Sequence, residues 1–152
     1  MTENTKPQFA IQGLYIKDLS FESPNAPQIF GQKAKPQANM DLQTRNRPLG
    51  DNRYEVVLSI TVTMTAEENT VFLVELQQAG IFVISGLDDE QLKQTLGSYC
   101  PNVLFPYARQ TVATIVMQGG FEPIHLSPVN FDALYLQHLK QEQQKPQSAE
   151  TH

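Results

Sequence analysis

The stretch Arg53-Tyr-Glu-Val-Val-Leu-Ser-Ile-Thr-Val-Thr-Met-Thr65 is the most regular segment of the chain. Every even-numbered residue from Tyr54 to Met64 is apolar, and most of the odd-numbered residues are polar. Such alternation is typical of a β-strand with one buried face and one solvated face. We therefore predict a long strand over Arg53–Thr65, in an antiparallel sheet that exposes one face to water.

A second long strand follows at once. Residues 66–70 are polar and predict a tight turn, after which Val71–Ser85 is again rich in apolar side chains. Large apolar residues occupy one face of this second strand, whereas Leu73 and Glu75 lie on the opposite, wetter face. Two long strands joined by a short polar turn indicate an antiparallel hairpin.

The segments before this hairpin are less regular. Phe9–Ile16 alternates loosely and predicts another strand. Three prolines interrupt Asp18–Asn39, so we expect a long connection there with little room for a helix or a central strand. Met40–Thr44 then predicts a short strand, which brings the expected sheet to four strands.

Helix signals dominate the chain after the hairpin. Asp88 is a suitable N-cap, and the acidic residues after it suit a helix N-terminus. We predict a short helix through Leu96 that is broken at Gly97 and restarts at Pro101. Pro106 lies inside the restarted helix and should kink it near its start.

The restarted helix has an unusually wide apolar surface from Val103 to Met117, and Gly119-Gly120 should end it. One small sheet cannot cover that surface on every side, so we expect another copy of the protein to cover the rest. Asn130 is a good N-cap for a second, amphipathic helix beginning at Phe131. Strands followed by helices predict an α+β fold, with two helices packed on one face of the four-stranded antiparallel sheet.

The composition sets further limits. The 152 residues fit a single domain, with an ordered body over about 8–140 and a polar, disordered tail over about 141–152. A net charge of −5 argues against a nucleic-acid-binding surface. A single cysteine and an N-terminus without an apolar signal segment predict a cytoplasmic protein, and no run of residues is apolar and long enough to span a membrane.

Motifs for catalysis or cofactors are scarce. No phosphate loop or dinucleotide fingerprint is present, the three histidines have no ligand-like spacing, and we expect neither a metal nor a cofactor. Cys100 with His125 or His138 would be the one candidate for a nucleophile and its base. A lone cysteine in an apolar segment is more often a packed thiol, so we expect no enzyme activity.

Five collinear segments carry a family resemblance. They are YIKDLSFESPNAP (15–27), YEVVL (54–58), ELQQAGIF (75–82), YCPNVLFPYAR (99–109) and LSPVNFDAL (126–134). Together they resemble the SecB family of bacterial protein-export chaperones over about residues 9–140, although residues 32–52 and the tail match poorly. The resemblance implies a homotetramer, built as a dimer of dimers around the long helix. It also implies an ATP-independent holdase that binds unfolded precursor proteins and delivers them to the SecA motor.

The resemblance also implies three groups of functional residues. The SecA-binding surface would include Asp18, Glu22, Leu73 and Glu75. The client groove, between the proline-rich connection and the second helix, would include Ile29, Phe30, Met40, Leu42, Leu134 and Tyr135. The oligomer interface would include Tyr15, Leu104, Ala108, Val112 and Ile115.

Three other hypotheses stay open at this point. The first alternative is a SecB-like chaperone that guards the antitoxin of a toxin–antitoxin system, and neighbouring genes, not the sequence, would discriminate it from an export chaperone. A thiol enzyme using Cys100 is the second alternative. A structural assembly module without clients is the third.

Overall fold

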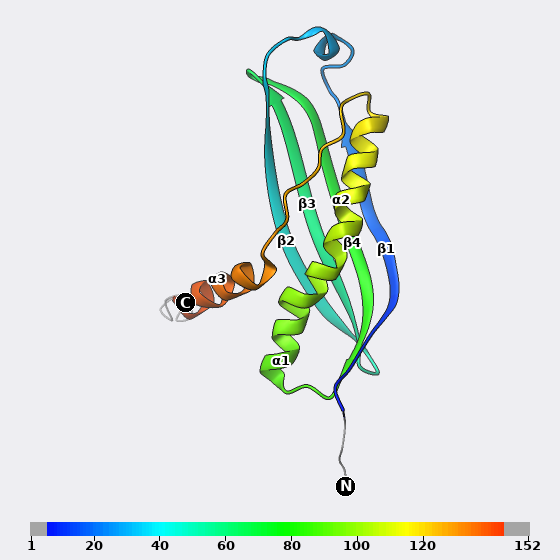
Figure 1. Cartoon of the computed structure of the whole chain (residues 1–152), viewed down its shortest axis with the longest axis vertical. Helices are drawn as coiled ribbons and strands as arrows, with labels where there is room; N and C mark the ends of the chain where they lie inside the picture. The colour runs from blue at the N-terminus through cyan, green and yellow to red at the C-terminus, as the bar shows by residue number, and fades with distance from the viewer. Residues whose placement is uncertain (1–5, 145–152) are drawn as a thin grey trace, which may run out of the picture.

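A four-stranded antiparallel sheet forms the body of the protein, with strand order β1-β4-β3-β2. The computed structural model describes residues 6–144, and helices lie over one face of the sheet (Figure 1). The strands are β1 (Gln8–Glu22), β2 (Pro36–Gly50), β3 (Arg53–Ala66) and β4 (Asn69–Ser85). The predicted α+β class and the predicted hairpin of two long strands are therefore confirmed.

Tight turns join the three consecutive strands β2, β3 and β4. Asp51 and Asn52 connect β2 to β3 with φ values of 56° and 62°, the left-handed geometry that a two-residue hairpin turn needs. Asp and Asn tolerate this conformation better than most residues do. These turns fix the register in which Leu58 lies opposite Thr44 on one side and Gln78 on the other.

The predicted connection over Asp18–Asn39 is too long, and the predicted strand over Met40–Thr44 is too short. β1 continues to Glu22, and β2 begins at Pro36 rather than at Met40. Only residues 23–35 connect the two strands, and they contain the short helix η1 (Gln28–Gly31). The alternation was hidden because β2 is an edge strand, where polar side chains and prolines are tolerated.

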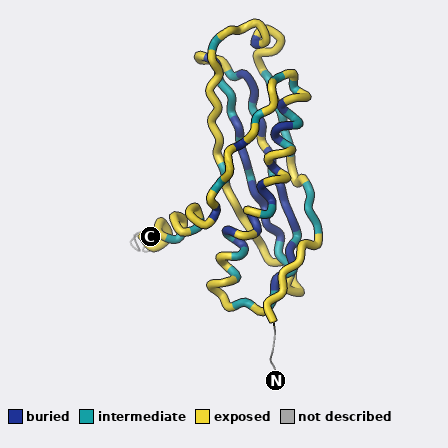
Figure 2. The backbone as a smooth tube through the Cα atoms, viewed as in Figure 1, coloured by how far each residue is buried: buried dark blue, intermediate teal, exposed yellow. Residues whose placement is uncertain are grey.

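The core lies between the sheet and the long helix α2 (Cys100–Gln118). Figure 2 shows buried backbone concentrated in the two central strands and along the sheet side of this helix. The even-numbered side chains of β3 and β4 point into this layer. The largest of them that are fully buried are Phe72, Phe82, Leu58, Ile60 and Leu76.

The irregularity predicted near the start of the long helix is confirmed, although the chain stays helical at Gly97. Helix α1 (Asp89–Gln94) starts at the N-cap Asp88 as predicted, with a capping box formed with Gln91. It then runs through a π-helical turn, η2 (Thr95–Tyr99), directly into α2. The wider π turn accommodates the proline at the start of α2 without interrupting the helix.

The last helix, α3 (Phe131–Gln144), points away from the sheet (Figure 1). Its N-terminus is capped as predicted, because the Asn130 side chain accepts a hydrogen bond from the backbone N–H of Ala133 at 3.0 Å. Helix α3 continues to Gln144, and the rest of the predicted tail, residues 145–152, lies outside the described part of the chain, as do residues 1–5. Within residues 6–144, no helix combines the length and apolarity needed to cross a membrane.

Candidate functional site

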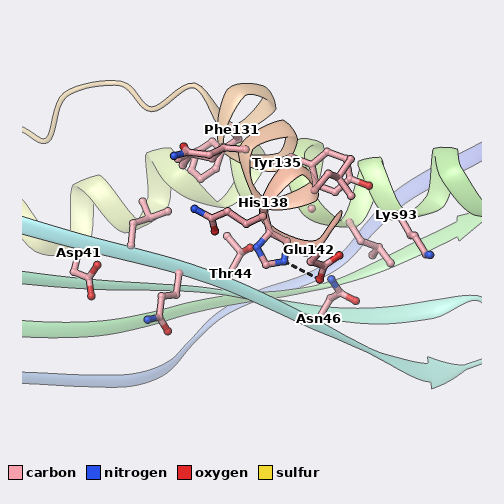
Figure 3. A pocket seen from close by; sticks show the side chains of 16 residues that line it. Asp41, Thr44, Asn46, Lys93, Phe131, Tyr135, His138 and Glu142 are labelled. Carbon is pink, nitrogen blue, oxygen red and sulfur yellow. Dashed lines mark ion pairs between the residues drawn. The ribbon is translucent and has the colours of Figure 1, made fainter. Parts of the chain in front are cut away.

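A groove with a volume of about 1020 Å³ runs between strand β2 and helix α3, with the start of the long helix at one end. Figure 3 shows α3 above β2, with His138 and Glu142 pointing down toward Thr44 and Asn46. Apolar and polar side chains both line it. The apolar ones are Leu42, Leu96, Phe131, Leu134, Tyr135 and Leu139, and among the polar ones are Asp41, Thr44, Asn46, Lys93, His138 and Glu142.

Helix α3 is positioned by three contacts at its N-terminal half. The ring of Tyr135 lies against Gly97 in the π turn, where an added Cβ would be 2.6 Å from Cδ1 of that ring. The buried hydroxyl of Ser98 donates a hydrogen bond to the carboxylate of Asp132. Phe131 packs edge-on against Phe105, with ring centroids 5.8 Å apart. The π turn therefore holds one wall of the groove in place.

The charged groups of the groove come from three elements. Nε2 of His138 lies 3.2 Å from Oε1 of Glu142, one turn along α3 (Figure 3). Lys93 of α1 and Asp41 of β2 also line the groove. Both signs of charge are present among the lining side chains, so the groove carries no strong net charge to select an acidic or basic ligand.

The structure brings together half of the predicted groove residues. Leu42, Leu134 and Tyr135 all line this groove. Met40 lies two residues from Leu42 on the same face of β2 and is 38% exposed. Phe30 is 53% exposed and stacks on Phe121 outside the described lining, at a centroid distance of 5.0 Å.

Ile29 requires a correction. It is only 6% exposed and belongs to the core, because the short helix η1 turns its side chain inward. The lining of the groove also includes residues that were not predicted. Thr44, Asn46 and Lys93 were missed because they are polar, and aliphatic or aromatic side chains were sought.

The four residues predicted to bind SecA share the sheet face opposite the helices, which we call the open face. Glu22 pairs with Leu73, and Asp18 pairs with Gln77, between β1 and β4. Glu75 lies in the next row, between Ser20 and Thr61. The register thus places Glu22 and Glu75 next to the half-buried Leu73, with Asp18 one row beyond Glu75.

A buried carboxylate on the same open face was missed from the sequence. Glu55 is 5% exposed and accepts hydrogen bonds from Tyr15, Lys17 and Arg47, the last two at 2.9 Å. The hydrogen bond from Tyr15, followed by those from Lys17 and Arg47, outweighs burial and lowers the pKa of Glu55 to about 2. Burial, and then the bond to Glu55, raises the pKa of Tyr15 to about 12.

The Glu55 cluster ties three strands together across the open face. Tyr15 and Lys17 come from β1, Arg47 comes from β2, and Glu55 lies on β3 between them in the strand order. Arg45 adds a hydrogen bond to Gln77 at 3.4 Å. The open face consequently has two ends. At one end, the basic side chains of the cluster are paired with Glu55, and at the other end acidic side chains lie around Glu75.

The predicted interface residues of the long helix need a correction. Leu104, Ala108 and Val112 have no exposed surface in the single chain, because they pack against the sheet. They form the core of the monomer and have no free surface for another copy. Ile115 and Tyr15 are half-buried, and Tyr15 is engaged with Glu55. The exposed apolar side chains of α2 are instead Tyr107 and Met117.

Cys100 is a packed thiol. It is completely buried beneath the sheet, and burial raises its pKa to about 12. A buried thiol with a raised pKa forms little of the thiolate that a nucleophile requires. This observation argues against the thiol-enzyme hypothesis. No group of three or more potential metal ligands occurs within residues 6–144.

Comparison with known proteins identifies the family. The family model described as preprotein translocase subunit SecB matches residues 2–142. The chain is 51% identical over 147 residues to the protein-export protein SecB of Hahella chejuensis, covering 94% of this chain and 92% of the relative. The chain belongs to the SecB family. The SecB of Marinobacter nauticus is 54% identical over 140 residues, covering 92% of this chain and 85% of its own length.

The fold has a counterpart among solved structures. A SecB-like chaperone from Mycobacterium tuberculosis, in complex with a peptide from an antitoxin, aligns with a TM-score of 0.67 and 15% identity. The alignment covers 80% of this chain and 90% of that protein. At this identity the likeness concerns the fold alone. The identities of 51–54% to export proteins support SecB chaperone function for this chain, and the antitoxin alternative is not favoured.

Proposed function

We propose that this member of the SecB family is an ATP-independent, cytoplasmic holdase that binds unfolded precursor proteins in the groove between β2 and α3. The observation that carries the proposal is the groove itself, an open channel with apolar side chains of α3 and the π turn on one side, in a member of an export-chaperone family. Unfolded chains expose the apolar segments that folded proteins hide, so such a channel selects for non-native proteins. The mixed charge of its rim permits many different sequences to bind.

Affinity must come from several grooves acting together. Burying ~300 Å² of apolar client surface gives roughly 7–8 kcal/mol at about 25 cal/mol per Å². Association and ordering cost about 4–15 kcal/mol, so one groove binds weakly. Several grooves on one oligomer, engaged by one long chain, raise the avidity through effective concentration. We therefore include a homotetramer, a dimer of dimers, in the proposal.

The exposed apolar side chains support such an assembly. Tyr107 and Met117 lie on the outer side of α2 and are 49% and 57% exposed. Ile11 and Ile16 of the edge strand β1 are 45% and 48% exposed. An interface that covered these side chains would remove from water apolar surface that the monomer leaves exposed.

Delivery to SecA is assigned to the acidic end of the open face. Glu22 and Glu75 flank Leu73, and Asp18 continues the row of carboxylates beyond Glu75, which gives an acidic strip with one apolar side chain. This composition suits a polar, transient interface with a basic partner surface. The acidic end of the open face lies on β1 and β4, whereas the groove lies along β2 and α3, so the proposal allows client and SecA to bind at the same time.

The groove assignment is tested by following aggregation of a chemically denatured precursor after dilution. We expect the wild type to suppress aggregation and a Leu134→Ser/Tyr135→Ser double variant to suppress it much less. The matched control is Leu136→Ser, since Leu136 is 57% exposed on the same helix but lies outside the groove. Equal suppression by all three proteins would remove the groove from the proposal.

A further inference from the structure

The groove borders the free edge of a β-strand. Among the strands of residues 6–144, β2 pairs only with β3, so its other edge has no neighbouring strand in that part of the chain. The residues of β2 that line the groove are Asp41, Leu42, Gln43, Thr44 and Asn46, which alternate between the two faces of the sheet. Because side chains from both faces of the sheet line the groove, the groove runs along the free edge of β2 and not only over one face of the sheet. Backbone groups as well as side chains are therefore available to a ligand.

The register determines which backbone groups point outward. The two-residue turn at Asp51-Asn52 makes its flanking residues, Gly50 and Arg53, a hydrogen-bonded pair. The carbonyl of Asn52 instead accepts a bond from the N–H of Ile84 on β4, at 2.9 Å. Odd-numbered residues of β3 consequently bond to β2, and even-numbered residues bond to β4.

The same alternation applies to β2. Its odd-numbered residues, such as Gln43 and Arg45, lie opposite odd-numbered residues of β3 and bond to them. Its even-numbered residues direct both N–H and C=O away from the sheet. In the groove these residues are Leu42, Thr44 and Asn46, which present unpaired donors and acceptors at intervals of about 6.6 Å.

Prolines close this edge at both ends. Pro36 and Pro48 are also even-numbered, so the positions without an N–H are the ones that face outward. Proline and charge are the usual means by which proteins protect an edge strand from pairing. Here the prolines stand near the ends of β2, and the charged residues Asp41 and Arg45 lie at odd-numbered positions, whose backbone groups bond to β3. The even-numbered positions beside α3, which lies above β2 in Figure 3, are neither proline nor charged.

We infer that an unfolded client segment binds in the groove as a fifth strand, antiparallel to β2, through backbone hydrogen bonds to Leu42, Thr44 and Asn46. The inference rests on the proposed chaperone function and specifies the ligand as an extended, proline-free stretch of polypeptide. Backbone bonds are independent of sequence, which suits a chaperone with many clients. Alternate client side chains then face Leu134 and Tyr135, so the preferred segment alternates apolar and polar residues.

The first test alters the ligand. The probe is a fluorescent synthetic peptide of about ten alternating leucine and threonine residues, with leucines facing α3. In an antiparallel hydrogen-bonded pair, the residues that face α3 are the ones whose N–H groups bond to β2. N-methylation of the leucines should therefore weaken binding by about tenfold or more, and N-methylation of the threonines should change it little. If only N-methylation of the threonines weakened peptide binding, the client strand would run parallel to β2, and the antiparallel direction would be wrong. If both N-methylated peptides bound equally well, the inference would be overturned.

The second test alters the protein. Thr44→Pro removes an outward N–H inside the groove, and Ala38→Pro removes an equivalent outward N–H outside it. Neither N–H belongs to the bonds with β3, so both variants should fold, which circular dichroism and thermal melting check. We expect about a tenfold loss of peptide affinity for Thr44→Pro and little change for Ala38→Pro and Thr44→Val.

The outcomes separate this inference from the proposed function. If Thr44→Pro binds the peptide normally while the wild type suppresses aggregation, strand addition is wrong and the chaperone function stands. If the wild type does not suppress aggregation, the proposed function itself fails. If Thr44→Pro changes the native mass in the absence of peptide, the edge pairs with a second copy, which also overturns the inference.

Discussion

Gly97 and Tyr135 are in direct contact, and the contact leaves no room for a larger residue. A Cβ on Gly97 would lie 2.6 Å from Cδ1 and 2.8 Å from Cε1 of the tyrosine ring. Both distances are well inside van der Waals contact. Glycine at this point of the π turn thus sets the distance between the turn and α3, and through it the width of the client groove.

Gly97→Ala should displace α3. The clash costs on the order of 1–3 kcal/mol, which exceeds the helix propensity of about 1 kcal/mol gained from alanine. We expect faster hydrogen exchange in Phe131–Leu139 and weaker binding of unfolded precursor. Gly31→Ala is the control, since nothing lies within 4 Å of a Cβ at that position. Identical exchange in α3 for both variants would show that the ring moves aside without consequence.

Glu55 should contribute a pH-dependent part of the stability. Its pKa falls from an ordinary 4.5 to about 2 on folding, so the contribution is present above pH 4.5 and is lost as the pH falls toward 2. Glu55→Gln should lower the free energy of unfolding at neutral pH by on the order of 1–3 kcal/mol, because charge-assisted hydrogen bonds are lost. The difference between wild type and variant should shrink between pH 4.5 and 2.

Urea unfolding at a series of pH values measures this difference. Glu75→Gln serves as the control, because Glu75 is exposed and has no hydrogen-bond or salt-bridge partner among the described residues. Its substitution should have little effect on unfolding. A difference for Glu55→Gln that stays constant down to pH 2 would contradict the assigned role of the carboxylate.

Much of the architecture could be predicted from local signals. Alternation over Arg53–Thr65 and the Asp88 and Asn130 caps depend on nearby residues, so the central hairpin and the helix starts were correct. The extent of β2 depends on its place at the edge of the sheet, which is set by residues far away in the chain. Its prolines were therefore interpreted as a connection.

Tertiary packing explains the other differences. The chain stays helical at Gly97 as a π turn, and the ring of Tyr135, 38 residues further on, packs on that glycine, a contact that the local sequence does not reveal. Glu55 resembled an ordinary solvated carboxylate, since its partners Tyr15 and Arg47 come from other strands. The sequence shows that Leu104 and Ala108 form an apolar stripe but not what covers it. In the structure the sheet covers both side chains completely, so they belong to the core of the monomer.

The SecA proposal predicts a selective effect of charge. Glu75→Lys reverses an exposed charge beside Leu73 and should reduce the affinity for SecA by about tenfold, while client binding stays within twofold. Binding to immobilised SecA and suppression of aggregation measure the two activities on the same samples. Glu122→Lys is the charge-matched control, on an exposed loop outside the open face. Parallel loss of both activities in Glu75→Lys would indicate misfolding instead.

The assembly proposal predicts that surface and core substitutions on α2 behave differently. Tyr107→Glu/Met117→Glu places charges on exposed apolar positions, so it should lower the native mass at dilute concentration while each chain stays folded. Leu104→Ala removes a fully buried side chain and should cost about 2–5 kcal/mol of stability, with the oligomer intact below the melting temperature. Native mass spectrometry with thermal melting distinguishes the two effects. If the double variant keeps the wild-type mass, the outer side of α2 does not hold the oligomer together, and the exposed residues of β1 become the next surface to test.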